Sequence, residues 1–210
     1  YGSTGDFEIT PNRSDCLSIT GLARETAACM DNDFKAPDTT LENECSGDIN
    51  SMIKVRIDTK NCNRYYARVV NDIKIEDSPW EMQKFLMEAG VRPINNIVDI
   101  TNFVMLELGQ PMHAFDYKSL EKADIIITDA EEGEKFTTLD GKERTLFADS
   151  LVIRDGDKSI GLGGIMGGEN SQIRDNTNVI MLEAANFNAS NIRSTSKKIS
   201  LRSEASQRFE

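Results

Sequence analysis

Short runs of alternating apolar and polar residues fill the second half of the chain, and this pattern constrains the fold most. Two Asp-Gly pairs, at positions 140–141 and 155–156, each lie between two such runs, which is typical of tight β-hairpins. Similar runs rich in β-branched and aromatic residues occur earlier in the chain. The pattern predicts strands at residues 52–58, 65–75, 125–128, 136–139, 144–147, 151–154, 158–162 and 179–182.

Segments with helical spacing are kept apart from these strands. Ser14 or Asp15 is expected to cap a first helix, and a capping box at residues 78–81 is expected to start a second helix that closes at Gly90. The helical segments are residues 14–30, 79–89, 96–108 and 188–198. The sequence therefore predicts an α+β fold: mixed strands and hairpins form a sheet-rich core, helices pack on it, and a short helical segment precedes it.

The length of 210 residues allows one large domain or two small ones. Residues 31–50 are polar and lack periodicity, which indicates a linker or a long loop. The chain begins with Tyr1 rather than Met, in the middle of a pattern, so we expect it to be a piece of a longer protein. No apolar run approaches the ~18–20 residues needed to cross a bilayer, which argues against membrane insertion.

The charge balance limits the kind of partner. The chain has 24 Lys and Arg against 35 Asp and Glu, a net charge of −11, which argues against a nonspecific nucleic-acid binder with a basic surface. It does not exclude an RNA substrate that another part of a larger protein holds. The bases are concentrated near the end, at Arg193, Lys197, Lys198, Arg202 and Arg208.

The histidine and cysteine content limits metal and redox chemistry. His113 is the single histidine, which excludes every metal site that needs two imidazoles. The four cysteines contain no C-x-x-C pair, so neither a zinc ribbon nor a thioredoxin-like motif is expected. We therefore expect no metal site, and a reducing, cytoplasmic compartment is the default for such a chain.

Three features are candidates for binding or catalysis. The glycine run at residues 161–168 fits neither a dinucleotide-binding nor a P-loop pattern, so it forms a kinked strand turn or leaves its backbone open to a ligand. His113 is expected in a loop, and a loop position favours function although lone histidines are more often structural. Glu183 follows a buried apolar run and needs a partner, which is Arg174, Arg193 or a polar ligand.

Thr101 lies on the apolar stripe of its predicted helix, with Asn102 beside it. A threonine in such a stripe usually donates a hydrogen bond to a carbonyl of its own helix. From the residues alone, the chain is an α+β domain with a pocket lined by glycine backbone, one histidine and one acid.

Several segments together resemble the beta subunits of bacterial phenylalanine–tRNA ligases, in particular their central editing region. They occur in the order of that family and cover most of the chain apart from residues 31–60. The segments are TPNRSDCLS at 10–18, RPINNIVDITNFV at 92–104, GQPMHAFD at 109–116, GIMGG at 164–168, LEAA at 182–185 and LRSEASQRFE at 201–210.

The resemblance implies a domain division and a site. Residues 1–50 would be the end of a small helical domain with a polar linker, residues 51–200 the editing domain, and residues 201–210 the lead into a further domain. The site would hydrolyse tyrosine wrongly attached to the phenylalanine tRNA. Its expected catalytic residues are His113, Thr101 and Asn102, and its expected substrate-binding residues are Glu183, Gly163, Gly164, Gly167, Pro111 and Ala185.

The resemblance also implies that Glu183 recognises the tyrosine hydroxyl, and that no cofactor is needed in this region. ATP and magnesium would serve a ligation site elsewhere in the parent enzyme, which would contain two alpha and two beta chains. An activated ester needs only a positioned water and donors for the oxyanion, and His113 could position that water, act as base or hold the terminal adenosine. The alternative is a non-catalytic RNA-docking or scaffold module that uses the basic C-terminal stretch.

Overall fold

Strands and helices are segregated in the computed structural model, which describes residues 4–10 and 12–210 and confirms the α+β class. The helices are α1 Ile19–Cys29, α2 Trp80–Glu88, α3 Asn96–Leu108, α4 Ala189–Lys198 and α5 Glu204–Phe209. The strands are β1 Lys54–Ile57, β2 Cys62–Val70, β3 Met112–Asp116, β4 Asp124–Asp129, β5 Lys135–Thr137, β6 Glu143–Thr145, β7 Leu151–Asp155, β8 Lys158–Leu162, β9 Met166–Gly167 and β10 Ile180–Phe187.

Two sheets position the rest of the molecule. The larger has the strand order β1-β4-β7-β8-β9, with β1 and β4 parallel and the other pairs antiparallel. The smaller is antiparallel and has the order β2-β10-β3, so the last strand of the chain lies between two earlier ones. Strands β5 and β6 form a separate two-stranded hairpin around the expected turn at Gly141.

One hydrophobic core joins the two large sheets. Ile125, Ile127 and Ile153 come from the five-stranded sheet, and Phe115 and Met181 from the three-stranded sheet, and each is at most 2% exposed. Full burial of a side chain of this size stabilises the fold by about 1.5–3 kcal/mol. The alternation of β10 places Met181, Glu183, Ala185 and Phe187 on this inner face, which puts an acid among apolar side chains.

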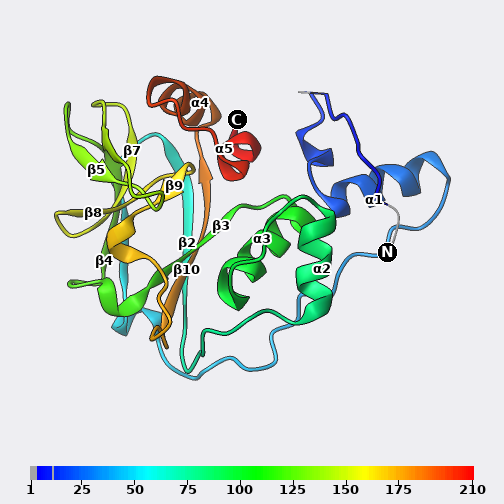
Figure 1. Cartoon of the computed structure of the whole chain (residues 1–210), viewed down its shortest axis with the longest axis horizontal. Helices are drawn as coiled ribbons and strands as arrows, with labels where there is room; N and C mark the ends of the chain where they lie inside the picture. The colour runs from blue at the N-terminus through cyan, green and yellow to red at the C-terminus, as the bar shows by residue number, and fades with distance from the viewer. Residues whose placement is uncertain (1–3, 11) are drawn as a thin grey trace.

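Helix α3 covers the opposite face of the three-stranded sheet. Ile97 of α3 packs against Ala114 of β3 and Ile180 of β10 in a second, smaller apolar cluster. Helices α2 and α3 stand side by side, on the side of β3 away from the five-stranded sheet, with α1 beyond them (Figure 1). Asn95 caps α3 by accepting from two backbone N–H groups, and Gly109 ends it in the left-handed region at φ +79°, so the helix has the predicted range of residues 96–108.

Two of the predicted helix starts are wrong. Residues 14–16 form a 3₁₀ turn, and Ser18 caps α1 by accepting from the Gly21 N–H at 3.0 Å. The expected capping box at residues 78–81 does not form, because Pro79 rather than Ser78 stands at the N-cap position. The Ser78 hydroxyl donates to the buried Asp99 carboxylate at 2.6 Å, which is a long-range contact that the motif does not predict.

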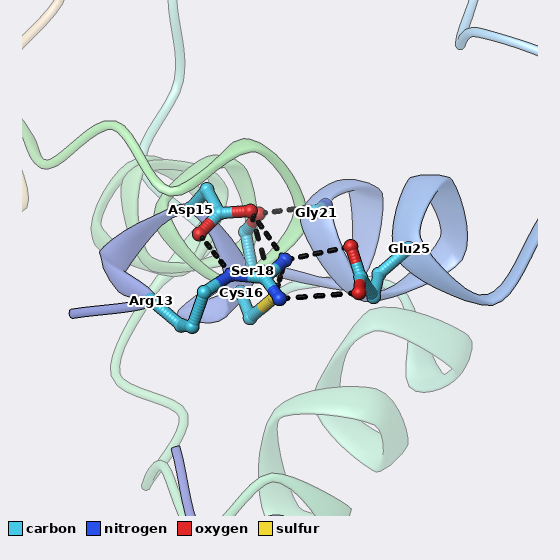
Figure 2. Close-up of polar contacts among 6 residues, drawn as sticks. All are labelled: Arg13, Asp15, Cys16, Ser18, Gly21 and Glu25. Atoms are coloured by element: carbon cyan, nitrogen blue, oxygen red, sulfur yellow. Dashed lines mark hydrogen bonds and ion pairs between the residues drawn. The ribbon is translucent and has the colours of Figure 1, made fainter. Parts of the chain in front are cut away.

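The N-terminal segment is organised around one guanidinium group. Figure 2 shows Arg13 between Asp15 and Glu25, with the Arg13 nitrogens 2.7–3.1 Å from the carboxylate oxygens. The hydrogen bonds of Arg13 hold the pKa of both carboxyl groups below their usual range. Residues 31–48 contain no helix or strand, in agreement with the expected linker.

Strand assignments differ from prediction at two places that matter for the site. Residues 112–116 form β3 rather than a loop, and β10 continues through Phe187 instead of ending at residue 182. In the described part of the chain, the four cysteines are free thiols. No helix among those residues has the length and apolar content required to cross a membrane.

Candidate functional site

A pocket opens between the two large sheets and α5. It encloses roughly 400 Å³ when the open space at its mouth is included. Its wall is made by the end of β3, the glycine-rich β8–β9 turn, the middle of β10 and the C-terminal helix. The lining residues are Pro111, Met112, His113, Phe115, Ile153, Gly161, Leu162, Gly164, Ile165, Met166, Gly167, Glu183, Ala205 and Phe209.

His113 projects from β3 into this pocket. Its ring meets the Phe115 ring edge to face, with centroids 4.5 Å apart, and its Nε2 atom is buried without a hydrogen-bond partner in the described part of the chain. Burial lowers the pKa of His113 to about 4, so the imidazole is neutral at pH 7. The expectation of a loop position is wrong, and a rigid strand holds the ring.

One glycine of the run, Gly167, is required by the close approach of this histidine. A Cβ atom built at Gly167 would collide with the Nε2 and Cε1 atoms of His113. Gly164 adopts φ +68°, which disfavours other residues. The run therefore forms a kinked strand turn, as one of the two interpretations predicted, and part of it lies at the pocket wall; that a ligand lies against its backbone stays a prediction.

Glu183 lies opposite His113 in the register of β10 and β3. It is 7% exposed, and its Oε2 atom accepts a hydrogen bond of 2.7 Å from the Tyr65 hydroxyl. Burial raises the pKa of Glu183 to about 7, and the bond from Tyr65 acts in the opposite direction. Among the described residues the partner of this acid is thus a tyrosine, not one of the two expected arginines.

The pocket brings together some of the expected site residues and not others. Pro111, His113, Gly164, Gly167 and Glu183 line it. The residues outside its lining are Thr101, Asn102, Gly163 and Ala185.

Each of these four residues lies on an element or makes a contact outside the pocket lining. Thr101 and Asn102 lie on α3, where the Thr101 hydroxyl donates to the Val98 carbonyl at 2.7 Å. Gly163 packs against Leu151. The Ala185 carbonyl accepts a hydrogen bond of 3.2 Å from the side chain of Gln110.

Several pocket residues were missed in the sequence, among them two on α5. Ala205 and Phe209 stand four positions apart on α5, so they share a helix face, and the Phe209 ring packs on Phe187 with centroids 5.1 Å apart. Their apolar i, i+4 spacing behind the cap residue Ser203 was the available signal.

A known protein family matches most of the residues that form this fold. Residues 61–210, which include both large sheets except β1, match the family described as the B3/4 domain. The chain belongs to the B3/4 domain family. This family assignment covers every residue that lines the pocket.

Curated relatives extend the similarity to almost the whole chain. It is 54% identical over 205 residues to the phenylalanine--tRNA ligase beta subunit of Clostridium acetobutylicum and 51% identical over 205 residues to that of Clostridium tetani. These matches cover 98% of this chain and 26% of each relative, so the chain spans about a quarter of their length.

A solved structure is also similar to this B3/4 chain. It is an N-terminal fragment of the phenylalanyl-tRNA synthetase beta-subunit from Pyrococcus horikoshii, at 16% identity and a TM-score of 0.49. The match covers 83% of this chain and 52% of that structure.

The chemistry that this pocket offers is limited and specific. His113 is a neutral imidazole whose Nε2 can accept a proton or orient a water molecule. In the described residues the N–H groups of Gly163 and Gly168 already donate to backbone carbonyls, whereas that of Gly164 has no acceptor. Glu183 adds an acceptor that is partly ionised near pH 7. Such a set suits hydrolysis of an activated ester that carries a hydrogen-bond donor.

Proposed function

We propose that this region hydrolyses the ester of tyrosine wrongly attached to the tRNA for phenylalanine, and so edits the product of a phenylalanine–tRNA ligase. The single observation that carries the proposal is a buried acid, Glu183, inside a small and mostly apolar pocket. The relatives are phenylalanine–tRNA ligase beta subunits. Tyrosine differs from phenylalanine by one hydroxyl, so it would be the competitor that such a ligase must reject. An apolar synthetic site rejects an added hydroxyl only ~100-fold, so a second site must remove the error.

Glu183 would make the selection. A carboxylate that accepts the phenol proton of tyrosine gains a hydrogen bond worth about 1.5–3 kcal/mol net. With phenylalanine bound, the same oxygen would be desolvated without a partner, which penalises the correct product. Both effects need an acid that is buried in the pocket, as Glu183 is.

His113 and Gly164 would act on the ester. A neutral imidazole with a pKa of about 4 is a weak base at pH 7. Its role in this proposal is to accept a hydrogen bond from the attacking water and so to orient it. The unpaired Gly164 N–H would donate to the developing oxyanion. Thr101 and Asn102 stay predictions from the resemblance, because they lie on α3 outside the pocket lining.

The larger protein would supply what this region lacks. Ligation with ATP and magnesium, the contact with an alpha subunit and most of the grip on tRNA would lie elsewhere. The net charge of −11 gives this region poor attraction to phosphates on its own. We therefore propose that the region receives the 3′ end of a tRNA held by other domains, in the cytoplasm.

Deacylation of tyrosyl- and phenylalanyl-tRNA, measured side by side in the ligase that carries this region, tests the proposal. Glu183→Ala should lower the preference for tyrosine by ~10–100-fold, the equivalent of the lost hydrogen bond. Glu183→Gln keeps the shape and should give an intermediate preference. A wild-type enzyme without deacylase activity would instead favour the non-catalytic docking module.

A further inference from the structure

Tyr65 lies behind the pocket and touches the acid that would select the substrate. It projects from β2 into the core, is 8% exposed, and is absent from the residues that line the pocket. Its hydroxyl is 2.7 Å from Glu183 Oε2, across 118 positions of sequence. Tyr65 pairs with Ala185 in the register of β2 and β10, which places it diagonally beside Glu183 on the same face of the sheet.

We propose that Tyr65 is a positioning residue for substrate selection: its hydroxyl holds one oxygen of Glu183 and leaves the other as a single acceptor for the phenol of tyrosine. This inference rests on the proposed function. Glu183 then accepts from one protein phenol behind the pocket and offers its other oxygen to a second phenol inside it. A ligand with a hydroxyl completes the arrangement, and a ligand without one leaves the free oxygen desolvated.

The titratable groups around Glu183 show how the Tyr65 hydroxyl stabilises its ionised carboxylate. The titratable groups that face it are Tyr65 and Cys62 from β2 and His113 from β3. Burial raises the pKa of the Cys62 thiol to about 11 and lowers that of His113 to about 4, so both are neutral at pH 7. The pKa of Tyr65 lies well above 10, which keeps its hydroxyl a donor. The hydroxyl of Tyr65 therefore supports the ionised form without adding a charge.

Two consequences distinguish positioning from a merely structural contact. The bond from Tyr65 lowers the pKa of Glu183, so its removal must raise that pKa further and reduce the anion present at neutral pH. The preference for tyrosine must then become more dependent on pH, because alkaline conditions restore the anion. A tyrosine that only fills the core would change stability without either effect.

The chain offers a matched control for this experiment. Tyr117 is partly buried, and its hydroxyl donates to the Met52 carbonyl at 2.7 Å, away from the pocket. Tyr65→Phe and Tyr117→Phe each remove one oxygen and one hydrogen bond of the same length. A fluorinated tyrosine at position 65 keeps the shape and donates a stronger hydrogen bond. It should therefore lower the pKa of Glu183, whereas Tyr65→Phe should raise it.

The first measurement is a carbon-13 NMR titration of the Glu183 carboxyl in the 210-residue chain. The Glu183 signal is identified as the one that is absent from the Glu183→Gln variant. Tyr65→Phe should raise the pKa of Glu183 above that of the wild type, and Tyr117→Phe should leave it unchanged. An unchanged pKa in Tyr65→Phe overturns the positioning role, whatever the enzyme does. This arm needs no tRNA, so it is independent of the proposed function.

The second measurement is the ratio of tyrosyl- to phenylalanyl-tRNA deacylation between about pH 6 and 8.5. Tyr65→Phe should lower the ratio by roughly 3- to 10-fold at pH 7 and recover part of it at the alkaline end, while Tyr117→Phe follows the wild type. A ratio equal to that of the wild type at every pH overturns the inference. If the NMR shift occurs and the wild-type enzyme has no deacylase activity, the proposed function fails and the control of Glu183 by Tyr65 stands.

Discussion

The cluster around Arg13 and the cluster around Glu183 place carboxylates in opposite surroundings. At the N-terminal segment, Asp15 and Glu25 share a guanidinium, and the side chains of all three are between 36% and 56% exposed. In the pocket, Glu183 is 7% exposed and is bonded by a neutral hydroxyl. The pKa is lowered at the first cluster, chiefly by the hydrogen bonds of Arg13, and raised to about 7 at the second by burial.

The difference separates an acid that serves the fold from one that is available to a ligand. Exposed carboxylates paired with an arginine stay ionised at physiological pH, and salt screens their interaction. They help to orient a short helix, and their charge does not change with small changes in their contacts. A buried acid with a neutral partner is close to its point of half ionisation at physiological pH. Small changes in its contacts therefore change its charge, which is the property expected of a group that recognises a substrate.

Glycine substitutions should show the largest difference in function between the two clusters. Gly167→Ala places a methyl group against the His113 ring, and Gly21→Ala places one against the Asp15 carbonyl of the N-terminal cluster. Displacing the imidazole by about 1 Å should slow tyrosyl-tRNA deacylation ~100-fold. Gly21→Ala should instead lower the melting temperature and leave deacylation by the folded enzyme unchanged.

Gly47→Ala is the control, because a Cβ atom there meets nothing within 4 Å. Equal losses of deacylation in the variants at Gly167 and Gly21 would contradict the separation of the two clusters.

The pH dependence of stability should expose two opposing contributions in the pocket. The ordinary pKa of 4.5 for Glu183 is raised to about 7, so between these values the folded state retains a proton that the unfolded chain has lost, and stability falls as pH rises. The ordinary pKa of 6.5 for His113 is lowered to about 4, so over that window stability rises with pH. Each contribution is worth about 3 kcal/mol, and they offset each other between pH 4.5 and 6.5.

Single substitutions should reveal each contribution. Glu183→Gln leaves the histidine, so the free energy of unfolding should rise by about 3 kcal/mol from pH 4 to 6.5. His113→Gln leaves the acid, so the free energy should fall by a similar amount from pH 4.5 to 7. Urea denaturation at a series of pH values measures both, and parallel curves for the two variants would show that neither group titrates as described.

The smallest effect is expected at the exposed cluster. Arg13→Gln removes the shared cation, so α1 should lose protection from amide hydrogen exchange at low salt, and the difference from wild type should shrink as salt is added. Deacylation should be unaffected. Lys74→Gln, which removes an exposed ion pair with Glu76 in a segment without a helix, is the matched control. A loss that persists at high salt would mean that Arg13 does more than pair with these two acids.

Local rules predicted the parts of the fold that depend on local chemistry. The Asp-Gly hairpins and the range of α3 follow from turn preferences and helical spacing. Ser78 shows where such rules fail, because Pro79 takes the cap position and the Ser78 hydroxyl bonds Asp99, 21 positions away.

The site was predictable only in part. His113 and Glu183 were candidates from the residues alone and from the resemblance, but the Gly-Gln-Pro sequence directly before β3 indicated a loop there. The Tyr65–Glu183 bond joins two strands 118 positions apart, and no local pattern encodes it.

The central place of β10 has a consequence during synthesis. Among the residues that the structure describes, β2 and β3 pair only with β10, so neither has its partner until residues 180–187 have been made. At ~5–20 residues per second, the ribosome takes roughly 6–24 s to add the 118 residues between Tyr65 and Glu183. Strand β2 stays open to wrong pairing throughout that time, and β3 stays open from residue 116 onward. The acid that would select tyrosine is carried by the strand that closes the sheet, so a nascent chain has no selecting site before this sheet is complete.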